Sequence, residues 1–280
     1  MATRSNLLSA DRGKHQATDT KSILKEAKVL AGLRDKYIVE VFSLGELPDG
    51  SLYLVMEYVE GKTLSRSIFE LGHLPESRVV DIGFQICQAI RTLHLQKIIH
   101  RDLKSANVIL SCAANEDIVK VVDFGLSKMV KSENQHKTST ETKTGMLVGT
   151  VDYMSPEVCS GQKATEASDI YSLGCILFEC LTGRLPFVCD NWVGLIYKHQ
   201  HEQAPKPSTL QAGISPILDA IVLKCLAKDP SDRFSVSELQ EHLHKIQCGI
   251  TTEVRVSAPK GLGSRIKYVA CVVVLGLLFC

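Results

Sequence analysis

The sequence lacks a large excess of charge of either sign. Its 280 residues contain 32 lysines and arginines against 31 aspartates and glutamates, a formal net charge of +1. The basic residues are spread along the chain rather than gathered in a stripe. Nucleic-acid-binding domains usually carry a basic face, so we expect no nucleic-acid partner.

Common cysteine motifs and an N-terminal apolar run are also absent. The ten cysteines include no CxxC pair, which argues against a zinc site. Several lie in apolar stretches such as SLGCILFECL, where cysteine acts as a small hydrophobic residue. This distribution favours reduced thiols in the cytoplasm over a disulfide framework. The N-terminal segment does not resemble a signal peptide.

The one long apolar run lies at the C-terminus, in residues 268–280, YVACVVVLGLLFC. As a helix it would rise roughly 20 Å, less than the roughly 30 Å hydrocarbon core of a bilayer. Lys260, Arg265 and Lys267 precede it, as expected on the cytoplasmic side of a membrane. We interpret the run as the start of a single transmembrane helix whose remainder is absent. A buried core helix or strand is the alternative, which the linker-like stretch before the run makes less favourable.

Apolar periodicity predicts a few strands followed by a mostly helical body. Residues 19–34 have apolar positions at helical spacing, and the turn PDG separates two strand-like stretches, 38–47 and 51–59. A long helix is expected over 75–96, and a hairpin from NVIL and IVKVV. Further helices are expected over residues 168–183, 191–200, 215–228 and 235–247.

The stretch HRDLKSANV places three chemically useful groups close together in the sequence. A carboxylate, Asp102, can orient and deprotonate a hydroxyl, and the ammonium group of Lys104 can contact a phosphate. The amide oxygen of Asn107 can bind a divalent metal ion. Asp123, in VKVVDFG, adds a second oxygen ligand at the end of another apolar run. Mg²⁺ favours a few protein oxygens completed by water and phosphate, so the pattern predicts a magnesium–nucleotide site.

The motifs HRDLKSAN, DFG, VGTVDYMSPE and SDIYSLG occur in an order that resembles the eukaryotic-type protein kinase family, in its bacterial Ser/Thr form. The resemblance covers roughly residues 20–247. It implies an α+β, two-lobed fold with a truncated N-terminal β lobe and a mostly helical C-terminal lobe. The expected division of the chain is a partial N-lobe in 1–58, a helical C-lobe in 59–247, a juxtamembrane linker in 248–267 and the membrane segment in 268–280.

The resemblance also implies roles for individual residues. Asp102 would accept or orient the proton of the substrate hydroxyl, Lys104 would touch the γ-phosphate of ATP, and Thr150 would hydrogen-bond the catalytic aspartate. Asn107 and Asp123 would hold Mg²⁺. The remaining nucleotide-binding candidates are the gatekeeper Met56, the hinge from Glu57 to Val59, and Glu26, which would pair with an ATP-binding lysine.

Further contacts implied by the resemblance are structural. An ion pair between Glu157 and Arg233 would tie the activation segment to the helical lobe, and Asp169 would brace the HRD backbone. His100 is expected to pack against Phe124 without a chemical role. The alternatives remain open: Glu26 and Lys104 as solvated charges, and the Glu157–Arg233 pair as unrelated surface charges.

The sequence before Glu26 contains no GxGxxG loop and no strand of the VAIK kind, and Lys14 is a poor substitute for the missing lysine. We therefore expect a membrane-tethered Ser/Thr kinase, facing the cytoplasm, that is weak or inactive as this truncated chain. The alternative is a non-catalytic kinase-like scaffold that binds protein partners. The expected partners of the kinase are proteins with Ser/Thr hydroxyls. A second copy of this chain is a further candidate partner, because two copies can phosphorylate each other in the polar segment 128–147. The candidate hydroxyls there are those of Thr138, Thr140, Thr142 and Thr144.

Overall fold

The structure is a computed structural model that describes residues 29–46, 52–113, 116–124, 151–250 and 252–256. Residues 29–32 are helical, which agrees with the end of the helix predicted over 19–34. The preceding part of that predicted helix lies outside the described residues. So do the apolar run 268–280, Thr150, Glu26 and the four activation-segment threonines.

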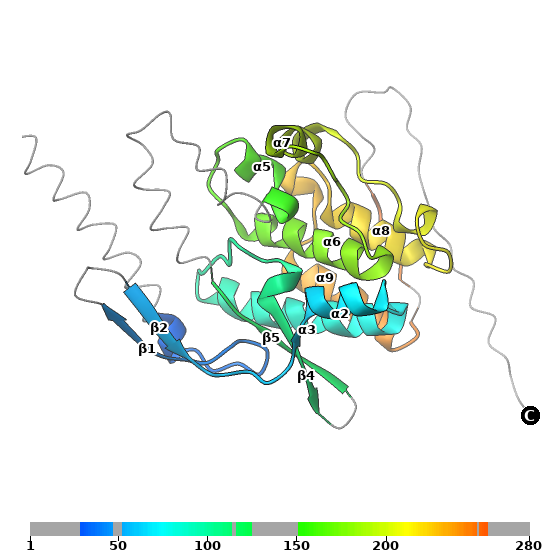
Figure 1. Ribbon diagram of the computed structural model, residues 1–280. Helices are drawn as coiled ribbons and strands as arrows, with labels where there is room; N and C mark the ends of the chain where they lie inside the picture. Colours follow the sequence, from blue (N-terminus) through cyan, green and yellow to red (C-terminus); the bar gives the residue numbers. More distant parts are fainter. Residues whose placement is uncertain (1–28, 47–51, 114–115, 125–150, 251, 257–280) are drawn as a thin grey trace, which may run out of the picture.

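A two-stranded antiparallel hairpin forms the small N-terminal part of the molecule (Figure 1). It consists of β1, Val41–Glu46, and β2, Leu52–Met56, with Val41 opposite Met56 and Gly45 opposite Tyr53. Both strands were predicted from the sequence. Val41 is buried, whereas Tyr53, three residues before Met56, the cross-strand partner of Val41, is 45% exposed, because successive strand residues point to opposite faces.

The larger part of the molecule is helical and contains a second small sheet (Figure 1). This sheet has the order β3–β4–β5, and the β4–β5 hairpin was predicted. Its strands are β3, Lys62–Thr63; β4, Val108–Ala113; and β5, Glu116–Val121. The helices are α2, Leu64–Leu71; α3, Glu76–Leu95; α5, Pro156–Cys159; α6, Glu166–Thr182; α7, Trp192–His201; α8, Pro216–Cys225; and α9, Val236–Gln247.

Helix α6 lies at the centre of the helical body and packs against α3 and α8. Ile170, Tyr171 and Phe178 are almost completely buried, so this helix is apolar around most of its circumference, as expected of a core helix. Buried, free Cys175 and Cys180 belong to the same core, in agreement with their predicted role as small apolar residues.

Helix α2 was not predicted. It is short, begins after the N-cap Thr63 and ends at Gly72, which has a φ of 80°. A β-carbon at Gly183, the left-handed C-cap of α6, would collide with the carbonyl oxygen of Gly72. Glycine at position 183 therefore allows the ends of two helices that are distant in the sequence to meet.

The packed region continues beyond α9, into the segment expected to be a linker. Val254 is only 5% exposed and belongs to the main core. Thr252 Oγ1 lies 2.6 Å from His242 Nδ1 of α9. No helix in the described ranges is both long and apolar enough to cross a membrane.

The predicted ion pair between Glu157 and Arg233 is confirmed. Arg233 Nη1 and Nη2 donate to the two carboxylate oxygens at 2.9 and 2.8 Å, and both side chains are almost fully buried. Ser168 Oγ donates to the same carboxylate at 2.7 Å. Burial alone would raise the pKa of Glu157, but the hydrogen bonds and charge of Arg233 outweigh it and lower the pKa to about 2.

Replacing Glu157 by Gln tests the contribution of this pair. The folded-state pKa lies below the ordinary value of 4.5, so the ionised carboxylate contributes stability that is complete above pH 4.5 and lost as the pH falls towards 2. The shift corresponds to roughly 3 kcal/mol at neutral pH. In urea unfolding, we expect Glu157→Gln to be less stable at pH 7 and to lose less stability between pH 4.5 and 2. Identical pH profiles of the two proteins would contradict this.

Candidate active site

The backbone of the candidate catalytic loop, residues 100–107, is fixed by one buried carboxylate from α6. Asp169 accepts hydrogen bonds from the backbone N–H groups of His100 and Arg101, at 3.0 and 3.1 Å. Arg101 has a φ of 64°, a conformation that is costly for a residue with a β-carbon. His94 Nε2, on α3, lies 2.8 Å from the same carboxylate. The predicted contact between Asp169 and the HRD backbone is therefore confirmed.

Asp102, Lys104 and Asn107 lie together in this loop. Lys104 Nζ donates to Asp102 Oδ2 at 2.9 Å. Asn107 Nδ2 donates to the backbone oxygen of Asp102 at 2.9 Å and to Oδ2 at 3.2 Å. These bonds identify the amide oxygen as the end of Asn107 that can bind a cation. The Asp102 side chain retains 16% exposure.

Asp123 follows a residue, Val122, whose backbone is hydrogen-bonded to that of Asn107. The N–H of Val122 donates to the carbonyl of Asn107 at 2.9 Å. Asp123 follows with a φ of 57° and an exposed side chain. The two predicted metal ligands therefore lie on neighbouring chain segments. In the described part of the chain, no three His, Cys, Asp or Glu side chains form a group that could hold a metal ion.

His100 and Phe124 pack together as predicted, with ring centroids 5.6 Å apart. His100 is fully buried. Burial lowers its pKa, although Asp169 and Asp102 act in the opposite direction. A neutral, buried imidazole has a packing role here.

The hinge candidates, Glu57 to Val59, directly follow β2, whose last residue is the gatekeeper candidate Met56. The N–H of Glu57 donates to the carbonyl of Glu40 at 2.8 Å. Met56 and Val59 are partly buried against the main core, whereas Tyr58 is 91% exposed. The carboxylate of Glu57 accepts a hydrogen bond from Lys120 Nζ at 2.9 Å, a contact that the sequence did not predict.

A second unpredicted group connects the catalytic loop with residues 151–153. Tyr153 OH donates to Glu179 Oε2 at 2.7 Å and lies 2.9 Å from Ser105 Oγ. Burial is the largest influence on both groups, and it raises the pKa of Tyr153 and the pKa of Glu179. Asp169 holds the start of the loop at His100 and Arg101, and this network holds it further along the chain, at Ser105.

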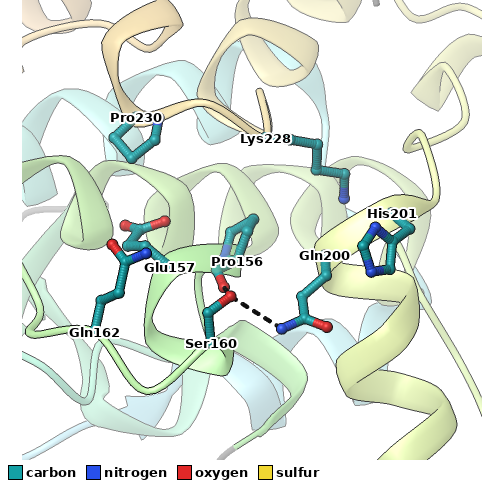
Figure 2. A pocket seen from close by; sticks show the side chains of 8 residues that line it. All are labelled: Pro156, Glu157, Ser160, Gln162, Gln200, His201, Lys228 and Pro230. Carbon is teal, nitrogen blue, oxygen red and sulfur yellow. Dashed lines mark hydrogen bonds between the residues drawn. The ribbon is translucent and has the colours of Figure 1, made fainter. Parts of the chain in front are cut away.

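A pocket of about 310 Å³ lies next to the Glu157–Arg233 pair and is lined by residues from 156–162, 200–201 and 228–230 (Figure 2). Gln200 Nε2 donates to Ser160 Oγ across it at 3.0 Å. Lys228, on its edge, donates to the carbonyls of Lys198 and His199 near the C-terminal end of α7. This arrangement stabilises the helix end, and of the described candidate catalytic residues neither Asp102 nor Lys104 lines the pocket.

The sequence and fold match those of known proteins. The family model of the protein kinase domain matches residues 8–244, and the chain belongs to this family. It is 39% identical over 242 residues to serine/threonine-protein kinase PknB of Mycobacterium leprae, across 85% of this chain and 37% of that protein. It is 38% identical over 217 residues to serine/threonine-protein kinase pkn3 of Myxococcus xanthus, across 76% of this chain and 39% of that protein. The chain thus spans less than two-fifths of the length of these curated relatives.

A solved structure supports the fold assignment. The crystal structure of Rad53 1-466 in complex with AMP-PNP matches with a TM-score of 0.64 and 28% identity, across 79% of this chain and 53% of that chain. The predicted α+β, two-lobed kinase fold, with few strands in the small lobe and a mostly helical large lobe, is confirmed.

Replacing Asp169 by Asn tests how the catalytic loop is held. An amide group would place N–H hydrogens against one of the two backbone donors, so we expect the free energy of unfolding to fall by about 2 kcal/mol. Amide hydrogen exchange at His100 and Arg101 should accelerate. The matched control is Asp219→Asn, because Asp219 is also buried and accepts two hydrogen bonds from Ser208. Slow exchange at His100 and Arg101 in Asp169→Asn would contradict this account.

Proposed function

We propose that this domain is a serine/threonine protein kinase that transfers the γ-phosphoryl group of ATP to Ser/Thr hydroxyls of proteins. The observation that carries the proposal is the group formed by Asp102, Lys104 and Asn107, with Asp123 on the neighbouring segment. Its membership in the protein kinase family supports the same reaction.

In the proposed reaction, Asp102 accepts a hydrogen bond from the substrate hydroxyl and orients its oxygen for attack. Lys104 neutralises negative charge on the transferred phosphoryl group. Asn107 and Asp123 supply oxygen ligands to Mg²⁺, which when bound offsets the charge of the nucleotide phosphates. Thr150 is proposed to hydrogen-bond Asp102, and Glu26 to pair with an ATP-binding lysine. Met56 and the backbone from Glu57 to Val59 would contact the adenine.

The rate of the 280-residue chain is expected to be low. Residues 1–25 contain neither a glycine-rich loop nor a strand of the VAIK kind. Loss of one preorganised group that stabilises charge costs on the order of 10² to 10³ in rate. We therefore expect slow phosphorylation, measured with radiolabelled ATP and a general substrate such as myelin basic protein over long incubations.

Asp102→Asn tests the proposed chemistry. We expect phosphoryl transfer to fall by roughly 10²-fold or more, while a fluorescent ADP analogue with Mg²⁺ still binds, because the metal ligands remain. The control is Asp152→Asn, which changes a half-buried aspartate in the neighbouring segment 151–153 to which no role is assigned. Equal activity of Asp102→Asn and the unaltered chain would refute the proposed role and point to a contaminating kinase.

A non-catalytic scaffold remains the second candidate, because the chain lacks the glycine-rich motif while retaining the helical lobe. This alternative predicts Mg²⁺–nucleotide binding without transfer under any condition, including in a chain given a glycine-rich loop and a VAIK-like strand. Transfer by the supplemented chain that depends on Asp102 would exclude it.

Membrane attachment through residues 268–280, with the domain on the cytoplasmic side, is also proposed. A lysine at the centre of such a segment opposes insertion by roughly 2.5–3.5 kcal/mol. After expression in bacteria, lysis without carbonate and sedimentation of the membranes, we expect the unaltered chain in the membrane pellet and Val274→Lys in the supernatant, because a segment shorter than a full span need not resist carbonate. Val274→Ile, which preserves the apolar character, should remain in the pellet. Extraction of the unaltered chain into the supernatant would contradict the proposal.

A further inference from the structure

Lys120 connects three segments that are far apart in the sequence. It lies on β5, three residues before the candidate metal ligand Asp123. Its Nζ donates to the carboxylate of Glu57 at 2.9 Å and to the backbone oxygen of Ile38 at 3.3 Å. One ammonium group thus joins the strand leading to Asp123, the start of the hinge and the segment entering β1.

The carboxylate of Glu57 has a second partner. Its Oε2 accepts a hydrogen bond from the N–H of Glu40 at 3.2 Å, and the N–H of Glu57 donates to the carbonyl of Glu40 at 2.8 Å. Burial by itself would raise the pKa of Glu57, but the Lys120 hydrogen bond and the Glu40 N–H outweigh it and lower the pKa. The Lys120 side chain is only 17% exposed, so this ion pair is better shielded than the pairs on the helix surfaces.

The backbone bonds between the hairpin and the body hold a different part of the chain. Val39 N–H donates to Val121 O at 3.0 Å, and Val121 N–H donates to Tyr37 O at 2.8 Å. These bonds fix residues 37–39 on β5, but they do not reach the hinge. The backbone bond of Glu57 leads only to Glu40, next to this segment, whereas the Lys120–Glu57 pair joins β5 directly to the residue at which the hinge begins.

We infer that Lys120 is a positioning residue for nucleotide binding, which holds the hinge backbone from Glu57 to Val59 at a fixed distance from Asp123. This inference rests on the proposed function, in which the adenine contacts the hinge and the phosphates lie near the metal ligands. A nucleotide that contacts both ends binds more tightly when their spacing is set beforehand, because less ordering is then needed on binding. Lys120 itself touches neither the nucleotide nor the reacting atoms.

Lys120→Met tests this role because methionine keeps the length and the apolar stem but removes the charge. We expect the Kd of a fluorescent ADP analogue with Mg²⁺ to rise roughly three- to tenfold, the effect of losing a partly buried ion pair. Lys120→Arg, which keeps the charge and can still donate to both oxygens, should restore most of the affinity. The control is Lys245→Met on α9, which removes the exposed ion pair with Glu241 and should leave the Kd unchanged.

Two measurements separate positioning from general stability. Binding is measured well below the unfolding temperature of each variant, and a double-mutant cycle combines Lys120→Met with Glu57→Gln. If the pair acts as a unit, the double variant should bind the nucleotide about as weakly as either single variant. Glu57→Gln alone should show the same loss of affinity, so the role can be judged even if Lys120→Met does not fold.

The outcomes distinguish this inference from the proposed function. If the unaltered chain binds the nucleotide and both Lys120→Met and Glu57→Gln bind it equally well, the positioning role is overturned and the kinase proposal stands. Additive losses in the double variant would also overturn the positioning role, because independent effects do not require the pair. If the unaltered chain does not bind Mg²⁺–ADP at all, both proposals fail.

Discussion

The geometry of the site depends on the buried carboxylate of Asp169. A buried charge is costly unless it is hydrogen-bonded, and here two backbone N–H groups and His94 satisfy it. The same bonds offset the cost of the left-handed conformation of Arg101. The carboxylate comes from α6, in which most residues are buried, so the position of the loop bearing Asp102 is set by the core of the helical lobe. The position of the partly buried Asp102 carboxylate is thus set by the fully buried carboxylate of Asp169.

The sequence predicted contacts that short motifs encode. HRD, DFG and SPE placed Asp102, Asp123 and Glu157, and the family resemblance paired Glu157 with Arg233 despite their separation. Strands and long helices were also predictable because their apolar periodicity is regular. The roles of the site residues remain predictions, and Thr150 and Glu26 lie outside the described residues.

Other contacts could not be predicted because only the folded chain brings their partners together. Lys120 and Glu57 are separated by 63 residues. Each lies in a stretch whose sequence pattern predicts only a strand with a charged residue on its surface. Tyr153 belongs to the motif VGTVDYMSPE and Glu179 to an apolar helix, and neither sequence pattern indicates that the two side chains are in contact. Helix α2 was missed for a local reason, since it is too short for its periodicity to stand out between Thr63 and Gly72.

The structure also separates the two requirements of phosphoryl transfer. The groups that would orient the hydroxyl and bind Mg²⁺ are held by α3, α6 and the β4–β5 hairpin, all within the helical lobe. Their arrangement therefore does not depend on a glycine-rich loop or on the lysine of a preceding strand. The proposed adenine end of the site would instead depend on the hinge that follows β2, which is attached through residues 37–40 and the Lys120–Glu57 pair.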